Sequence, residues 1–194
     1  MLILASASPR RRELLGKMGL EFEVVPPEAD EVVPPGLKNP REAALHLASE
    51  KGREVARLRP HDWVLAADTI VTLGAEILGK PRDGADALLM LQKLSGRAHL
   101  VITAFCLLNA SLGREHLEAV ETKVFFHEVP EKVLAAYAAS PEPLDKAGAY
   151  AIQGGAAGFV KRIEGSCSNV VGLPVERLSE VLRQEGIFSA PWGR

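Results

Sequence analysis

A continuous apolar run, Trp63–Ala67, leads directly into Asp68 and limits the folds open to this chain. An uninterrupted apolar run of strand length is typical of a strand buried on both faces, and such strands are covered by helices. Ser8–Pro9 and Asn39–Pro40 each place a cap residue before a proline, the pattern of a helix start. The sequence therefore predicts an α/β fold, with a mixed sheet and flanking helices.

The other hydrophobic patterns extend this prediction along all 194 residues. Glycine-containing turns at Gly74 and Gly113 indicate two hairpins. No internal repeat or linker interrupts the chain, so we predict a single domain over residues 1–194 with a cleft. We expect strands over 1–5, 21–25, 63–67, 70–73, 76–78, 100–108 and 117–128, and helices over 9–18, 40–58, 84–94, 130–139 and 175–184.

Charge and cysteine content exclude several classes of protein. Lys and Arg number 23 against 25 Asp and Glu, a net charge of −2, which argues against wrapping duplex DNA. Cys106 and Cys167 are too few for a disulfide scaffold, lack metal-finger spacing and fit a reducing cytosol. No apolar run approaches the length that spans a bilayer. We therefore expect a cytoplasmic protein with neither a nucleic-acid nor a membrane partner.

The segment Ser6–Arg12 places three arginines in the first turn of a predicted helix. Cations are unfavourable there because the helix dipole is positive at its N-terminus. A bound anion would remove the conflict, since it gains backbone N–H groups, serine hydroxyls and guanidinium hydrogen bonds. We therefore interpret the segment as a polyphosphate site. The alternative is a solvated charge run whose arginines pair with nearby acids such as Glu13.

The segment Gly74–Pro81 has the spacing of a P-loop up to its lysine. Pro81 stands where the P-loop hydroxyl that holds Mg²⁺ is required. A proline also disfavours helical backbone in the residue before it, so no helix can begin at Lys80. We reject a P-loop. Lys80 is either a point charge that faces phosphates or an ordinary solvated lysine.

Asp68–Thr69 follows the apolar strand, at the edge where open α/β sheets build their sites. An aspartate there can hold a divalent cation or accept a proton from water. The alternative is a turn or cap aspartate. Glu28, Asp30 and Glu31 lie in a predicted loop and could supply a second carboxylate, although loop acids are usually only solvated.

The segment Asp145–Gly154 begins a glycine-rich stretch that extends to Gly165. Glycines permit close approach of the backbone to a ligand, and Gln153 can read a base edge through its paired donor and acceptor. The alternative is a bulged hairpin with strained turns. A GxGxxG fingerprint is missing, which argues against a Rossmann site, and Gly165–Asn169 lacks the flanking pattern of a nucleophile elbow.

Taken together, these segments resemble the Maf family of nucleoside triphosphate pyrophosphatases. The matching segments occur in the family's order along nearly the whole chain: Ser6–Leu15, Ala67–Thr69, Gly79–Pro81, Leu94–Gly96, Asp145–Gly154 and Val170–Pro174. The resemblance implies a fold like that of the inosine triphosphate pyrophosphatases, with two lobes around a deep cleft. It also implies hydrolysis of a nucleoside triphosphate to the monophosphate and pyrophosphate, a divalent metal cation (Mg²⁺ or Mn²⁺) and a homodimer.

The resemblance also assigns roles to individual residues. Asp68 matches the catalytic proton acceptor, while Arg11, Thr69 and Gln153 match the positions that set base preference and are similar to the branch acting on dTTP and UTP. The remaining polar matches, which the family places near phosphates or metal, are Ser8, Arg10, Glu31, Lys51, Lys80 and Lys146. From all of these matches together we predict phosphate contacts for Ser8, Arg10, Arg11 and Lys80, and metal contacts for Glu31 and Asp68. The two roles of Asp68 conflict, because a carboxylate bound to a metal is a weak base.

We therefore expect a hydrolase that converts dTTP, UTP and modified uridine triphosphates to monophosphates and pyrophosphate, as housecleaning of nucleotide pools. One rival is a nucleotide-binding regulator of cell division with negligible turnover. The other is a module for single-stranded nucleic acid, which the 5% aromatic content disfavours because such modules stack bases on aromatic side chains.

Overall fold

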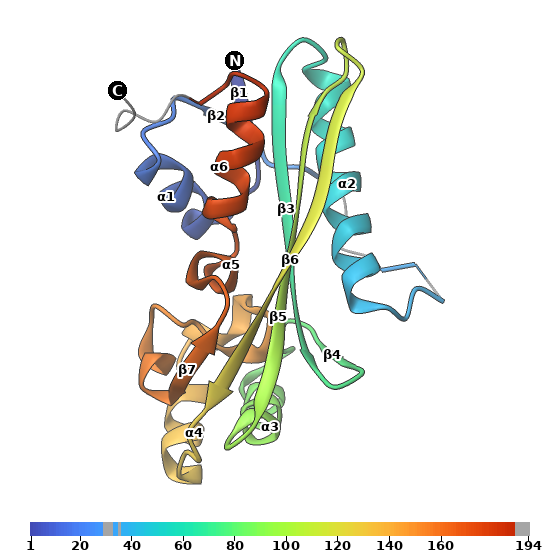
Figure 1. Cartoon of the computed structure of the whole chain (residues 1–194). Coiled ribbons are helices and arrows are strands. Elements are labelled where there is room, and N and C mark those ends of the chain that lie inside the picture. The colour runs from blue at the N-terminus through green and yellow to red at the C-terminus, as the bar shows by residue number, and fades with distance from the viewer. Residues whose placement is uncertain (29–32, 35, 189–194) are drawn as a thin grey trace. The chain divides into compact units, whose positions relative to one another are not determined.

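The computed structural model describes residues 1–28, 33–34 and 36–188 (Figure 1). Its strands form one mixed sheet in the order β2-β1-β3-β5-β6-β7, with β4 paired to β3. β1 pairs in parallel with β2 and β3, whereas the β3–β4 and β6–β7 pairs are antiparallel. The predicted mixed α/β fold is therefore confirmed. The strands are β1 (Leu2–Ala5), β2 (Glu23–Val24), β3 (Trp63–Leu73), β4 (Glu76–Leu78), β5 (Ala98–Asn109), β6 (Arg114–Phe126) and β7 (Val160–Glu164).

The helices begin where the sequence places cap residues. Ser8 accepts from the backbone N–H of Arg11 and caps the first helix, while Asn39 and Asp83 cap the second and third in the same way. The predicted helix starts at these three positions are confirmed. The α-helices are α1 (Pro9–Lys17), α2 (Pro40–Leu58), α3 (Gly84–Leu94), α4 (Glu131–Ala138), α5 (Cys167–Val171) and α6 (Val175–Gln184), and the short 3-10 helices are η1 (Glu142–Asp145), η2 (Ala147–Ala149) and η3 (Gly155–Phe159).

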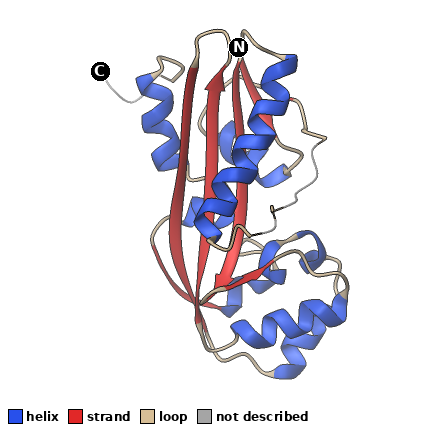
Figure 2. Cartoon of the chain, turned by 90° about the vertical axis from the view of Figure 1, so that its right-hand side faces the viewer, coloured by secondary structure: helices blue, strands red, loops and turns tan. Residues whose placement is uncertain are grey.

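The chain folds into two compact units, each assembled from separate segments. Unit 1 comprises Met1–Asp68, Thr103–Val120 and Gly172–Arg194, and unit 2 comprises Thr69–Ile102 and Glu121–Val171. In unit 1, α1 and α6 lie on one face of the strands and α2 lies on the other (Figures 1 and 2). The apolar faces of α1 and α6 form one core with the strand residues Leu4, Leu65 and Phe105. Burial of these faces is what holds the strands of unit 1 in place.

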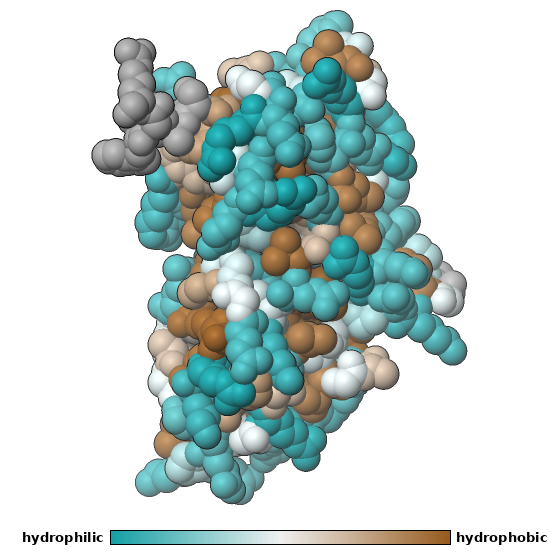
Figure 3. Space-filling view, viewed as in Figure 1, coloured by the Kyte–Doolittle hydropathy of each residue, from teal (hydrophilic) through white to brown (hydrophobic). Residues whose placement is uncertain are grey.

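Unit 2 has its own core, in which aromatic side chains meet edge to face. The ring of Phe126 lies 4.9 Å from that of Tyr150 and 6.1 Å from that of Phe159, which in turn lies 5.3 Å from Tyr137. Such contacts add to the stability gained by burial alone. The molecular face in Figure 3 is mainly hydrophilic. No helix within the described residues combines the length and apolar character needed to cross a membrane.

Two sequence expectations about strands are wrong. β3 does not end at Asp68 but continues to Leu73, because β-branched residues such as Ile70 and Val71 favour strand conformation. Parallel pairing with β1 stops at Ala66, whereas antiparallel pairing with β4 begins at Val71, so Asp68 lies between the two pairings. The other error is in the glycine-rich stretch, which contains the strand β7.

Candidate active site

Asp68 and Lys51 form a buried ion pair in unit 1. The Lys51 Nζ donates to Asp68 Oδ1 at 2.6 Å, and the two side chains are only 7% and 8% exposed. Asp68 comes from β3, and Lys51 lies on the buried face of α2 with Ala48 and Val55. Charges buried to this degree cost several kcal/mol unless they are paired, so each group requires the other.

The start of α1 follows the point where the parallel pairing of β1 with β3 stops, two residues before Asp68. In the β1–β3 register, Ala5 stands opposite Ala66, and the chain leaves β1 at Ser6 to enter α1 at Pro9. Neighbouring strands are about 4.8 Å apart, so the β1–α1 connection passes beside the stretch of β3 that leads to Asp68. Asp68 and the start of α1 thus both follow the end of the β1–β3 pairing within unit 1.

Arg11 folds back over this connection. Its Nε donates to the Gly172 carbonyl at 2.8 Å and its Nη1 donates to Ser6 Oγ at 3.3 Å. Ser6 Oγ also accepts from the Ser8 backbone N–H at 3.2 Å, so Ser6 and Ser8 together order the turn. Arg10 and Arg11 are half-buried, whereas Arg12 is exposed. Glu13, one of the acids near these arginines, pairs with Lys17 at 2.5 Å.

Unit 2 carries Thr69, Lys80 and Gln153. Thr69 is half-buried on β3 directly after Asp68, and the other two residues are exposed. The backbone N–H of Gly148 donates to the Gly79 carbonyl at 3.1 Å, which joins the chain before Lys80 to the segment that carries Gln153. The hairpin strand β4 occupies part of the P-loop-like spacing, which confirms that this segment is not a P-loop.

The segment Asp145–Gly154 needs glycine at one position for steric reasons. Gly148 has a φ of +71°, and a Cβ there would lie 2.9 Å from a methyl carbon of Val71. Only glycine combines that backbone conformation with such close packing. The Lys146 Nζ donates to the Glu142 carbonyl at 2.6 Å and to Asp145 Oδ1 at 2.5 Å, so its charge is held within the segment.

Burial shifts the pKa of two titratable side chains, His99 and Cys106. Desolvation lowers the pKa of His99 to about 4, and its Nε2 lies 2.8 Å from the Tyr150 hydroxyl. Desolvation, followed by the charge of Glu115, raises the pKa of the Cys106 thiol to about 12. Cys106 therefore remains a thiol at neutral pH, and a thiol is a poor nucleophile.

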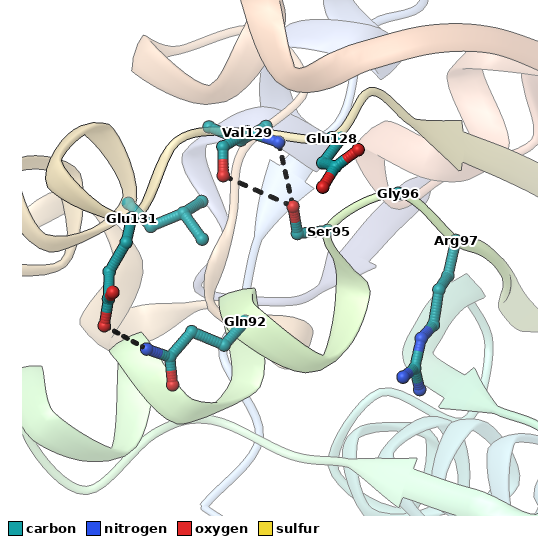
Figure 4. A pocket seen from close by; sticks show the side chains of 8 residues that line it. Gln92, Ser95, Gly96, Arg97, Glu128, Val129 and Glu131 are labelled. Atoms are coloured by element: carbon teal, nitrogen blue, oxygen red, sulfur yellow. Dashed lines mark hydrogen bonds between the residues drawn. The ribbon is translucent and has the colours of Figure 1, made fainter.

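An open pocket of about 510 Å³ lies elsewhere in unit 2 (Figure 4). Ser95 Oγ accepts from the Val129 backbone N–H at 2.9 Å, and Gln92 donates to Glu131 at 3.0 Å. Ser95 therefore ties the end of α3 to the chain before α4, which gives the segment Leu94–Gly96 a structural role. The predicted phosphate, base and metal residues do not line this pocket.

Carboxylates that could hold a metal do not cluster in the part of the chain that the structure describes. No group of three or more His, Cys, Asp or Glu side chains there could bind an ion. Glu31, the predicted second ligand, lies outside the described residues. Mg²⁺ at phosphate sites commonly takes only one or two carboxylates together with substrate oxygens and water. Asp68, which uses one carboxylate oxygen for Lys51, fits that kind of donor set.

Comparison with known proteins identifies the family. The family sequence model described as Maf-like protein matches residues 1–185. This chain belongs to the Maf family. The dTTP/UTP pyrophosphatase of Anaeromyxobacter dehalogenans is 52% identical over 195 residues, covering 100% of this chain and 97% of that protein. The protein of the same name from Thermococcus kodakarensis is 49% identical over 177 residues, covering 91% and 92%.

The Maf chain shares its fold with a solved structure, the Ham1 protein of Staphylococcus aureus. The TM-score is 0.55 with 13% sequence identity, and the match covers 95% of this chain and 98% of that one. At this identity the likeness concerns the fold alone. The expected α/β architecture is confirmed by this match and by the sheet described above.

The local sequence pattern did not predict the buried ion pair of Lys51. Lys51 stands on α2 three and seven residues after Ala48 and Ala44, so it falls on the apolar stripe of that helix. A lysine on a buried helix face needs an acidic partner. The spacing of Lys51 from Ala44 and Ala48 could therefore have predicted a buried ion pair from the sequence. The partner itself, Asp68, follows only from the fold.

Proposed function

We propose that this Maf chain is a dTTP/UTP pyrophosphatase that hydrolyses its substrate to the nucleoside monophosphate and pyrophosphate. Relatives 45–52% identical over nearly their whole length carry that name. The observation that carries the proposal is the buried Lys51–Asp68 pair beside the start of α1. A paired carboxylate near a helix N-terminus combines a proton acceptor with an anion-binding element, the two components that phosphoanhydride hydrolysis requires.

In the proposed reaction, water attacks the α-phosphorus and Asp68 accepts its proton. The Lys51 Nζ fixes the position of one carboxylate oxygen of Asp68. The α1 backbone N–H groups and the guanidinium groups of Arg10 and Arg11 bind the triphosphate, and Lys80 adds a further positive charge. Positioning and charge stabilisation supply most of the rate in such transfers.

A divalent cation, Mg²⁺ or Mn²⁺, belongs to the proposal. Asp68, with Glu31 as the other candidate ligand, would hold it together with substrate oxygens. When bound, the cation offsets the charge of the triphosphate. Thr69 and Gln153 select the base, and Gln153 reads the hydrogen-bonding edge through its paired donor and acceptor. We also propose a cytoplasmic homodimer without a nucleic-acid partner.

The decisive experiment measures pyrophosphate release from a panel of canonical and modified nucleoside triphosphates with Mg²⁺. We expect dTTP and UTP to yield pyrophosphate and monophosphate, with no free phosphate and no turnover after the cation is chelated. Binding of dTTP without release of pyrophosphate would instead favour a nucleotide-binding regulator. The mass of the protein in solution tests the homodimer.

A further inference from the structure

Two side chains hold both ends of the turn that carries Gln153. The Ala151 backbone N–H donates to the Tyr137 hydroxyl at 3.2 Å, and the Gly155 N–H donates to the Glu142 carboxylate at 3.0 and 3.1 Å. We propose that Tyr137 and Glu142 are positioning residues for base selection, because they fix the backbone on either side of Gln153. This inference rests on the proposed function, in which Gln153 reads the base, and it names the side chains that hold Gln153 in place.

The two supporting side chains are themselves connected. The Tyr137 hydroxyl donates to Glu142 Oε1 at 3.1 Å. Burial raises the pKa of the Tyr137 phenol, which keeps its proton in place for this bond. One continuous hydrogen-bonded path therefore runs from Ala151 through Tyr137 and Glu142 to Gly155. Such paths order a segment more effectively than separate bonds, since each bond polarises the next.

Packing confirms that Glu142 lies directly against the turn. A Cβ at Gly154 would fall 1.8 Å from Glu142 Oε1, so a side chain at this position would displace the carboxylate. A Cβ at Gly155 would lie 3.2 Å from the Tyr137 ring. The glycines thus allow both supporting groups to reach the backbone.

The turn itself has little regular structure to hold it. Residues 150–154 belong to no strand or helix, and the Gly154 N–H donates within the turn to the Ala151 carbonyl at 3.1 Å. Gln153 is exposed, whereas Tyr137 is buried and Glu142 is half-buried. An amide distinguishes bases only if its donor and acceptor are both correctly placed, because hydrogen bonds weaken steeply with angle. Ordering of this turn therefore translates into selectivity.

The test compares dTTP with dCTP, which share the sugar and the triphosphate and differ in the hydrogen-bonding edge of the base and in the C5 methyl group; the comparison of each variant with the wild type cancels the effect of the methyl group. In the full-length protein with Mg²⁺, we expect Glu142→Ala and Tyr137→Phe each to lower the ratio of kcat/KM for dTTP to that for dCTP about five- to tenfold, the value of one misplaced hydrogen bond. We expect kcat at saturating dTTP to stay within about twofold, since the phosphate-binding residues are unchanged.

Three further variants separate positioning from general destabilisation. Glu142→Gln keeps a carbonyl acceptor for Gly155 and should retain most of the wild-type ratio. Glu164→Ala removes an exposed carboxylate that pairs with Arg162 in the same unit, and should leave the ratio unchanged. In a Gln153→Ala background, Glu142→Ala should cause no further loss, because a positioning residue acts only through the residue it positions.

The outcomes distinguish this inference from the proposed function. If Gln153→Ala lowers the ratio while Tyr137→Phe and Glu142→Ala leave it unchanged, the positioning role is wrong and base reading stands. An equal loss from Glu142→Ala with and without Gln153 also overturns it. If the wild-type protein releases no pyrophosphate from dTTP, the proposed function itself fails. Should Glu142→Ala not fold by circular dichroism, Tyr137→Phe, which removes a single oxygen, decides the question.

Discussion

Each of the two units buries a polar pair, but the two pairs are held in opposite ways. In unit 1, Lys51 and Asp68 are oppositely charged groups 2.6 Å apart. In unit 2, His99 and Tyr150 are neutral, since burial lowers the pKa of His99 to about 4, and their hydrogen bond measures 2.8 Å. Burying two charges costs more free energy than burying a neutral pair. Replacing a buried ion pair with apolar residues of similar volume often leaves the stability of a protein unchanged or raises it. The pair in unit 1 is therefore charged and the pair in unit 2 is neutral, so the two should respond differently to substitution and to pH.

The largest effect should follow from removing the charge of Asp68. We expect Asp68→Asn to reduce turnover of dTTP by roughly two to four orders of magnitude, with substrate binding largely kept, because the base is lost. Single-turnover kinetics and nucleotide binding measure the two separately. Asp62→Asn, which removes an acid paired with Arg59 near the start of β3, is the matched control. Near-wild-type turnover in Asp68→Asn would exclude its role as proton acceptor.

Lys51→Met should reveal the energetic cost of the charged pair. It leaves Asp68 buried without its cation, so we expect the free energy of unfolding to fall by about 3–5 kcal/mol in denaturant titrations. The double variant Lys51→Met with Asp68→Leu should recover most of that loss while remaining inactive, since an apolar pair carries no burial penalty for charge. A loss below about 1 kcal/mol in the single variant would mean that water solvates the Asp68 carboxylate and removes most of the cost of its burial.

The neutral pair in unit 2 should make the free energy of unfolding depend on pH. Because His99 titrates at about 4 when folded and near 6.5 otherwise, the unfolded chain binds the extra proton between these values. Stability from this residue is therefore complete above pH 6.5 and is lost as pH falls toward 4, by about 3 kcal/mol in total. His99→Gln can keep a hydrogen bond to Tyr150 without titrating. Its free energy of unfolding should depend less on pH than that of the wild type, and equal pH profiles would refute the assignment.

The same contrast explains what could be predicted from sequence. The caps Ser8, Asn39 and Asp83 act on neighbouring backbone, so their patterns predicted where α1, α2 and α3 begin. The end of β3 was misplaced because a polar residue in the middle of a strand looks like a terminus until its neighbours are known. β7 was missed because its five residues lie within a glycine-rich stretch.

Contacts between distant residues limited the prediction of the site. The Arg11 segment was interpreted as an anion site from helix electrostatics alone, but its bond to the Gly172 carbonyl joins residues 161 positions apart. Tyr137 and Glu142 had no signal of their own, since their partners are backbone groups of a turn. Local patterns therefore predicted candidate site residues, whereas contacts such as that of Arg11 with the Gly172 carbonyl follow only from the tertiary structure.

Arg11→Ala should separate nucleotide binding from turnover in unit 1. Loss of one charge-assisted contact should weaken dTTP binding by about 2–3 kcal/mol, measured by calorimetry with Asp68→Asn as the inactive background. Arg12→Ala is the control, because Arg12 is the exposed member of the same run. Equal affinities in the two variants would contradict the assignment of Arg11 to the triphosphate.

The smallest effects concern the caps, and they test whether the two units unfold together. Asn39→Ala removes the cap of α2 in unit 1, and Asp83→Ala removes the cap of α3 in unit 2. Each should lower the free energy of unfolding by about 1 kcal/mol. β3, β5 and β6 each run from one unit into the other, so both variants should shift one shared transition in calorimetry. Two transitions, each shifted by one variant alone, would show that the charged and neutral pairs belong to regions that unfold independently.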